Sequence, residues 1–136
     1  MQGRSDSLKN LKINMKESSM PNKLIIAVDF DGTLCEMKWP GIGKPNLRLI
    51  SVLIKMREAG NDLILWTCRE TENLDSAIEW CKSFGLHFDK VNEDSDSSQW
   101  EPGRKVVADI YIDDRAFTPD GFCNFFDQLL ISGFIK

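Results

Sequence analysis

The sequence has little of what marks a thiolate metal site, a membrane protein or a secreted protein. His87 is the only histidine, and the four cysteines (Cys35, Cys68, Cys81 and Cys123) include no CxxC pair, which argues against structural zinc. No apolar run approaches the roughly 18 residues of a membrane span, and the N-terminus lacks the apolar core of a signal peptide. We therefore expect a cytoplasmic protein with reduced thiols and no membrane contact.

The chain also lacks an excess of positive charge. Its net charge is -4 and its pI is about 5.0, which argues against a protein that holds nucleic acid by bulk electrostatics but does not exclude a nucleotide substrate. Its 136 residues and 42% hydrophobic content fit one globular domain. Residues 1–19 mix lysine, serine and isolated apolar residues without a period, so we expect a solvated extension followed by a single domain over residues 20–136.

What is present is an alternation of short apolar runs and amphipathic stretches. The run of Leu24 to Val28 predicts a strand buried on both faces, as in the centre of a parallel sheet. Further strands are expected around residues 63–66, 88–91 and 110–112, with a polar loop over 92–103. Helices are expected over 47–59, from an N-cap at Thr71 to about Gly85, and over 117–130, the last packing on the sheet. This order indicates an α/β fold.

Two carboxylates, Asp29 and Asp31, follow the first apolar run directly. Chemistry in parallel sheets takes place at the carboxyl ends of the strands. Because carboxylates this close repel each other, a divalent cation between them is the simplest explanation.

The string Asp29-Phe30-Asp31-Gly32-Thr33-Leu34 resembles the first signature of the haloacid dehalogenase-like (HAD) hydrolase superfamily. Three later elements resemble the remaining signatures in order. Thr67 ends the second apolar run, Lys105 lies upstream of the last strand with Arg104 as its competitor, and Asp113-Asp114 ends that strand.

The resemblance implies a three-layer α/β/α sandwich, Rossmannoid, with a central parallel sheet and its first strand in the middle. It also implies a phosphatase that hydrolyses a phosphate monoester through an aspartyl-phosphate. Asp29 would be the nucleophile and Asp31 the general acid and then base. The Mg²⁺ ligands would be Asp29, the backbone carbonyl of Asp31 and Asp113, with Asp114 direct or through water. Thr67 and Lys105 would hold the phosphoryl oxygens.

Arg69, close to the Thr67 position, could add bidentate contacts to the substrate phosphate, and a surface role is the alternative. About ten residues separate the first signature from the next helix, too few for a large cap domain. We therefore expect a small phosphorylated metabolite, held by the short flap near Trp39 and the loop near Trp100. A macromolecular substrate, such as a phosphoprotein or a nucleic-acid end, is the alternative, and a second subunit of a homo-oligomer could supply a lid.

Two readings from other classes compete with a phosphatase. A signalling receiver domain combines similar residues on a parallel sheet, but there the acidic pair comes first, whereas here it comes last. A catalytically idle binding module on the same fold would not need Asp29, Asp31, Thr67, Lys105 and Asp113 to be intact.

Overall fold

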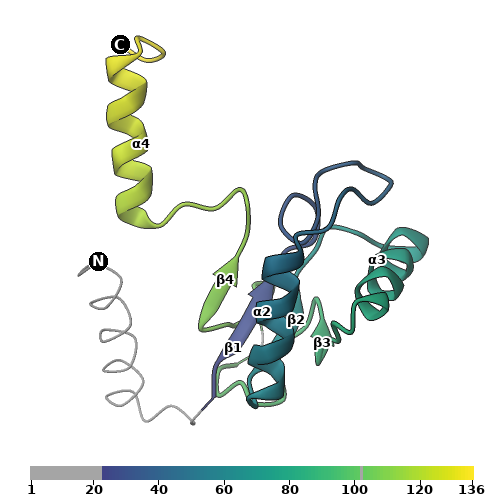
Figure 1. The fold of residues 1–136 in the computed structure, drawn as a ribbon. Helices are drawn as coiled ribbons and strands as arrows, with labels where there is room; N and C mark the ends of the chain where they lie inside the picture. The colour runs from purple at the N-terminus through teal and green to yellow at the C-terminus, as the bar shows by residue number, and fades with distance from the viewer. Residues whose placement is uncertain (1–22, 102) are drawn as a thin grey trace.

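The computed structural model describes residues 23–101 and 103–136. The predicted extension, residues 1–19, lies outside the described residues. The described elements follow one another in the order strand, helix, strand, helix, strand, strand, helix (Figure 1). Their bounds are β1 Ile25–Val28, α2 Leu47–Glu58, β2 Asp62–Leu65, α3 Thr71–Ser83, β3 Lys90–Val91, β4 Ile110–Ile112 and α4 Pro119–Ile131.

The four strands form one parallel sheet in the order β3-β2-β1-β4. The prediction of a parallel α/β fold with the first strand in the middle is therefore confirmed. All four residues of β1 are buried, as expected for a strand with a neighbour on each side. Val28 is in register with Leu65 of β2 and with Ile112 of β4, so the three strands end at the same edge of the sheet.

Helices α2 and α3 cover one face of the sheet. Ile26 and Val28 of β1 pack there with Leu53 of α2 and with Ala77 and Cys81 of α3. The rings of Phe30 and Trp80 meet edge to face, with centroids 5.5 Å apart, so Trp80 packs against the core.

The other face of the sheet carries a smaller apolar cluster. Ile25, Ala27 and Ile64 pack there against Val106, from the segment between β3 and β4. This segment is tied down by its own polar side chains: the hydroxyl of Ser95 donates to Asp62 at 2.6 Å, for example. A loop therefore covers the face on which a second layer of helices was expected.

The ends of the helices follow local sequence signals. Asn46 caps α2 by accepting a hydrogen bond from the backbone N–H of Leu49, and Thr118 caps α4 in the same way through Gly121. Thr71, expected as the cap of α3, is instead its first residue, and the capping position is Glu70.

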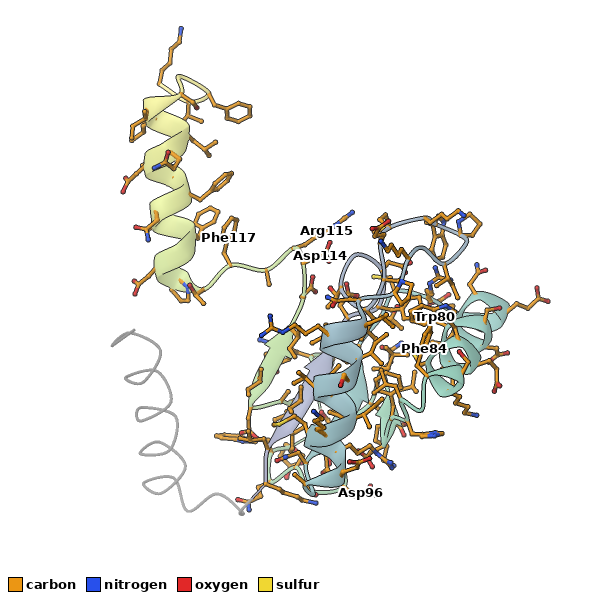
Figure 2. All side chains as sticks on the ribbon, viewed as in Figure 1. Trp80, Phe84, Asp96, Asp114, Arg115 and Phe117 are labelled. Atoms are coloured by element: carbon orange, nitrogen blue, oxygen red, sulfur yellow. The ribbon has the colours of Figure 1, made fainter. Side chains whose placement is uncertain are left out.

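The expectation that the last helix packs on the sheet is not met. No residue of α4 is buried, and the helix contacts no other described element. Figure 1 shows α4 standing away from the sheet, and in Figure 2 its side chains extend into open space. Phe117, at its base, stacks only on aromatic residues of α4 itself, with its centroid 5.1 Å from that of Phe125.

None of the described helices is long and apolar enough to span a membrane.

Candidate active site

A cavity of about 490 Å³ lies where β1, β2 and β4 end. Each of these strands is followed directly by polar residues, so the parallel arrangement gathers them at one edge of the sheet. Four of the residues that line the cavity are carboxylates and five are not: Asp29, Asp31, Asp113 and Asp114, with Met37, Trp39, Thr67, Cys68 and Arg115.

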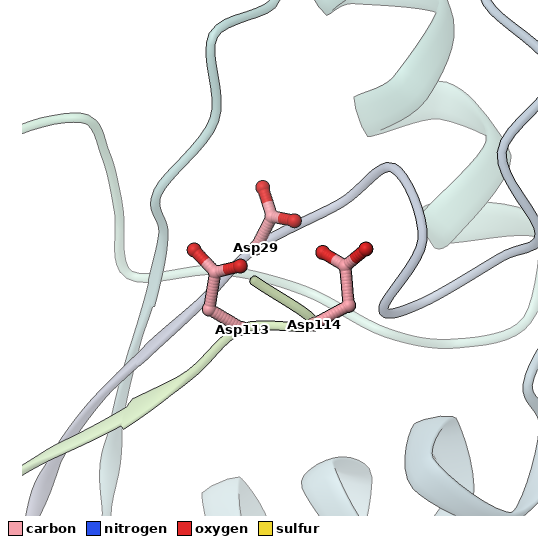
Figure 3. Close-up of side chains that lie close together, drawn as sticks. All are labelled: Asp29, Asp113 and Asp114. Atoms are coloured by element: carbon pink, nitrogen blue, oxygen red, sulfur yellow. The ribbon is translucent and has the colours of Figure 1, made fainter. Parts of the chain in front are cut away.

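Three of the carboxylates converge, as Figure 3 shows. Asp29 follows β1, and Asp113 and Asp114 follow the neighbouring strand β4. The backbone N–H of Asp29 donates to the carbonyl of Ile112 at 2.9 Å, which continues the pairing of the strands up to the site. One oxygen from each of the three carboxylates lies within 4.8 Å of the others.

Gly32 makes room for Asp114. A Cβ built on Gly32 would lie 2.3 Å from Oδ2 of Asp114, far inside van der Waals contact. The φ angle of Gly32 is +83°, a backbone conformation that residues other than glycine rarely adopt. The glycine after the two aspartates is thus required twice, once by the turn and once by the acidic pair.

Thr33 links the two strand ends, and sequence reasoning assigned it no role. Its hydroxyl oxygen lies 3.3 Å from a carboxylate oxygen of Asp29 and 3.3 Å from one of Asp114. It also accepts a hydrogen bond from the backbone N–H of Asp114 at 3.0 Å. The hydroxyl has one proton and can donate to only one of the two carboxylates at a time. The other carboxylate then receives no hydrogen bond from Thr33.

Burial raises the pKa of Asp29 to about 6, and the negative charge of Asp113 adds to the effect. A cluster of hard oxygen ligands whose charges repel each other suits a hard divalent cation such as Mg²⁺. The side chain of Asp31 is not part of this cluster. Its backbone carbonyl stays the predicted ligand.

Arg69 has a different place from the one predicted. Its side chain is only 1% exposed, and its Nε and Nη2 donate to the two carboxylate oxygens of Asp31 at 2.8 and 2.7 Å. The remaining N–H groups donate to the carbonyls of Pro40, Gly41 and Asn73. Because every donor of the guanidinium is taken, Arg69 has none left for a substrate phosphate.

Thr67 lines the cavity, as predicted from its position at a strand end. Its hydroxyl oxygen accepts a hydrogen bond from the backbone N–H of Arg69 at 3.1 Å, which leaves its proton free for another acceptor. Asn92 holds the backbone of Thr67 through two hydrogen bonds, of 2.8 Å to its N–H and 2.9 Å to its carbonyl. Nothing in the local pattern around Asn92 indicated this contact, which joins residues 25 positions apart.

The predicted basic residue, Lys105, does not line the cavity. Its ammonium group lies 4.8 Å from the centre of the Tyr111 ring, and both Lys105 and its predicted competitor Arg104 are exposed. Arg115, which sequence reasoning passed over, is the basic residue in the cavity wall. Its position directly after Asp113-Asp114 was the signal that could have found it.

Of the two tryptophans expected to hold a substrate, only one lies at the cavity. Trp39 lines the cavity, whereas Trp100 is 74% exposed and is not among the lining residues.

No family model matches the chain, and no curated protein matches it. A solved structure does: a conserved protein from Bacteroides thetaiotaomicron is 38% identical, and the match covers 85% of this chain and 94% of the other, with a TM-score of 0.64. At that identity and over almost the whole length of that protein, the chain belongs to the same family as the conserved Bacteroides protein.

Proposed function

We propose that this protein is a Mg²⁺-dependent phosphatase of the HAD type, which hydrolyses a phosphate monoester through an aspartyl-phosphate. The observation that carries the proposal is the convergence of Asp29, Asp113 and Asp114, with one oxygen from each within 4.8 Å of the others. The order of the motifs along the chain supports it, since DFDGT comes first and the acidic pair last.

Asp29 is the nucleophile in this proposal. Its carboxylate forms a bond to phosphorus while the bond from phosphorus to the ester oxygen breaks, and the leaving oxygen takes a proton from Asp31. Asp31 then removes a proton from water, whose oxygen attacks phosphorus and releases phosphate, which restores Asp29. The covalent detour divides one very slow hydrolysis into two easier steps.

The cation would be held by Asp29, Asp113 and the backbone carbonyl of Asp31, with Asp114 direct or through water. When bound, Mg²⁺ supplies charge neutralisation for an anionic substrate that approaches an anionic nucleophile. In the protein itself, the Thr33 hydroxyl donates to either Asp29 or Asp114, and it accepts a hydrogen bond from the backbone N–H of Asp114, which links the two strand ends. Thr67 and Arg115 both line the cavity, and in this proposal they contact the phosphoryl oxygens.

Asp31 faces the cavity while it is paired with Arg69. Its side chain is 14% exposed, and each of its oxygens has a second lone pair beyond the one used by the guanidinium. The pair therefore fixes the direction of the Asp31 carboxyl group, and the proton that it gives to the leaving oxygen would sit on one of these second lone pairs.

A small phosphorylated ester is the substrate class that fits best. The cavity volume, about 490 Å³, is within the range of small-molecule sites. The loop between β1 and α2, residues 29–46, adds one wall to the cavity through Met37 and Trp39.

The test is hydrolysis of para-nitrophenyl phosphate by purified protein, with Mg²⁺ and with excess chelator. We expect turnover only with Mg²⁺, and its loss in Asp29→Asn, because an amide is neither a nucleophile nor an anionic ligand. Asp96→Asn is the matched control, since Asp96 is 92% exposed and pairs only with Lys90. Full activity of Asp29→Asn, or full activity in chelator, would contradict the proposal, and inactivity of the wild type with Mg²⁺ would favour a binding module.

A further inference from the structure

Trp39 forms an aromatic wall of the active-site cavity. The residue lies in the loop between β1 and α2, and it lines the cavity together with Asp29 and Asp31. More than half of its surface, 56%, is exposed. An exposed indole this close to a nucleophile is available to a ligand.

The indole also packs against a buried cation. The guanidinium carbon of Arg69 lies 5.0 Å from the centre of the Trp39 ring and 4.9 Å from the centre of the Phe30 ring. Phe30 is fully buried and sits between Asp29 and Asp31 in the chain. The stack therefore runs from the core, through Arg69, to the cavity wall.

Arg69 also fixes the backbone that carries the indole. It donates from Nη1 to the carbonyl of Pro40 at 3.1 Å and from Nη2 to the carbonyl of Gly41 at 2.7 Å. These two residues follow Trp39 directly. The same guanidinium thus holds the Asp31 carboxylate, the Trp39 ring and the flap backbone in one arrangement.

A fixed aromatic face binds a planar ring at little entropic cost, because the platform does not have to be ordered when the ligand arrives. The phosphoryl group must reach Asp29, so the rest of the ester lies along the cavity, where Trp39 and Met37 provide its apolar wall.

We infer that the leaving group of the substrate carries a planar aromatic or heteroaromatic ring that stacks on Trp39. This inference rests on the phosphatase proposed above. It assigns Trp39 to substrate binding, and it assigns Arg69 to positioning Trp39 and Asp31.

The experiment compares benzyl phosphate with cyclohexylmethyl phosphate. The two esters have leaving groups of similar size and similar chemistry, and they differ in whether the ring is planar. We expect kcat/KM to favour benzyl phosphate by about 3- to 10-fold, the range of an aromatic pair. The preference should disappear in Trp39→Leu and persist in Trp39→Phe, which keeps an aromatic face. Trp100→Leu is the control and should keep the wild-type preference, because Trp100 lies outside the cavity wall.

Binding of the two corresponding phosphonates, in which a CH2 group replaces the ester oxygen, separates the inference from the proposed function. These are 2-phenylethylphosphonate and 2-cyclohexylethylphosphonate, and calorimetry measures their affinity for the wild-type protein. Tighter binding of 2-phenylethylphosphonate to a protein without turnover would support the stacking site and contradict the phosphatase. Equal kcat/KM for the two esters, or equal affinity for the two phosphonates, would overturn the stacking site and leave the phosphatase standing. Absence of 2-phenylethylphosphonate binding at millimolar concentration would also overturn the stacking site.

Discussion

The Arg69 guanidinium grips the Asp31 carboxylate by two parallel hydrogen bonds, from Nε to Oδ2 at 2.8 Å and from Nη2 to Oδ1 at 2.7 Å. The pair joins the end of β1 to the segment after β2, and it also holds the flap through the carbonyls of Pro40 and Gly41. A buried ion pair of this kind adds little to stability over an apolar pair, but losing one partner leaves a buried charge alone.

We therefore expect Arg69→Leu to destabilise the protein by about 3–5 kcal/mol, because the Asp31 carboxylate and three carbonyls lose their donor. Urea denaturation measures this free energy of unfolding. The control is Arg57→Leu, which breaks the pair of Arg57 with Asp89 at 3.1 Å, where the arginine side chain is 41% exposed. That change should cost less than about 1 kcal/mol. Equal costs for the two variants would mean that the Asp31 pair does not hold the site together.

Gly32→Ala should weaken Mg²⁺ binding as well as stability. The added Cβ would meet Oδ2 of Asp114 at 2.3 Å and so push that carboxylate away from Asp29 and Asp113. Gly60→Ala is the matched control, since Gly60 has a similar φ of +98° but open space around it. Both variants should lose about 1 kcal/mol or more to backbone strain.

Only Gly32→Ala should lose the rise in melting temperature that bound Mg²⁺ gives the wild type. The measurement is a thermal scan across a Mg²⁺ titration for the three proteins. A wild-type response to Mg²⁺ in Gly32→Ala would show that Asp114 does not contribute to the metal site.

The raised pKa of Asp29, about 6, predicts how stability depends on pH in the absence of metal. The folded protein holds this proton more tightly than the unfolded chain, where the ordinary value is 3.8. The resulting stabilisation is complete below about pH 4 and is lost as the pH rises through 6. A rise of this size corresponds to at most about 3 kcal/mol, and solvent screening of this half-buried group reduces it to about 1–2 kcal/mol.

We expect the difference in free energy of unfolding between wild type and Asp29→Asn, measured in chelator, to shift by that amount between pH 4 and pH 7. Subtracting the variant removes the contribution of the other titrating groups. Millimolar Mg²⁺ should restore wild-type stability at pH 7 and have little effect near pH 4, where a protonated Asp29 is a poor ligand. A difference that stays constant with pH would contradict the raised pKa.

The sheet and the acidic cluster could be predicted because their signals are local. Strands such as β1 and β4 are short apolar runs that end in carboxylates, and parallel strands place their carboxyl ends at one edge. The sequence alone therefore predicts that Asp29 and Asp113 meet, although they lie 84 positions apart.

The sequence did not predict the contacts that long side chains make with residues far away in the chain. Arg69 was expected to face the substrate, but its guanidinium turns back to carbonyls 28 and 29 residues earlier in the chain. Lys105 was placed at the site by its order in the motifs, and its ammonium group lies instead over the ring of Tyr111. Apolar periodicity gave α4 correctly as a helix, yet it does not indicate what the apolar face contacts.

The position of α4 leads to a last prediction, that the body of the protein does not need it. No residue of α4 is buried, and none lines the cavity of the candidate active site. A chain ending at Ala116 should therefore have a free energy of unfolding within about 1 kcal/mol of that of the full chain, and it should keep the proposed phosphatase activity. Because α4 exposes Phe122, Phe125 and Phe126, each at least 40%, the shortened chain should also be more soluble. Urea denaturation and light scattering measure these effects.

The full-length control replaces the three phenylalanines with serine and should behave like the shortened chain. A loss of several kcal/mol in the free energy of unfolding of both proteins would show that the apolar face of α4 packs against the body in solution.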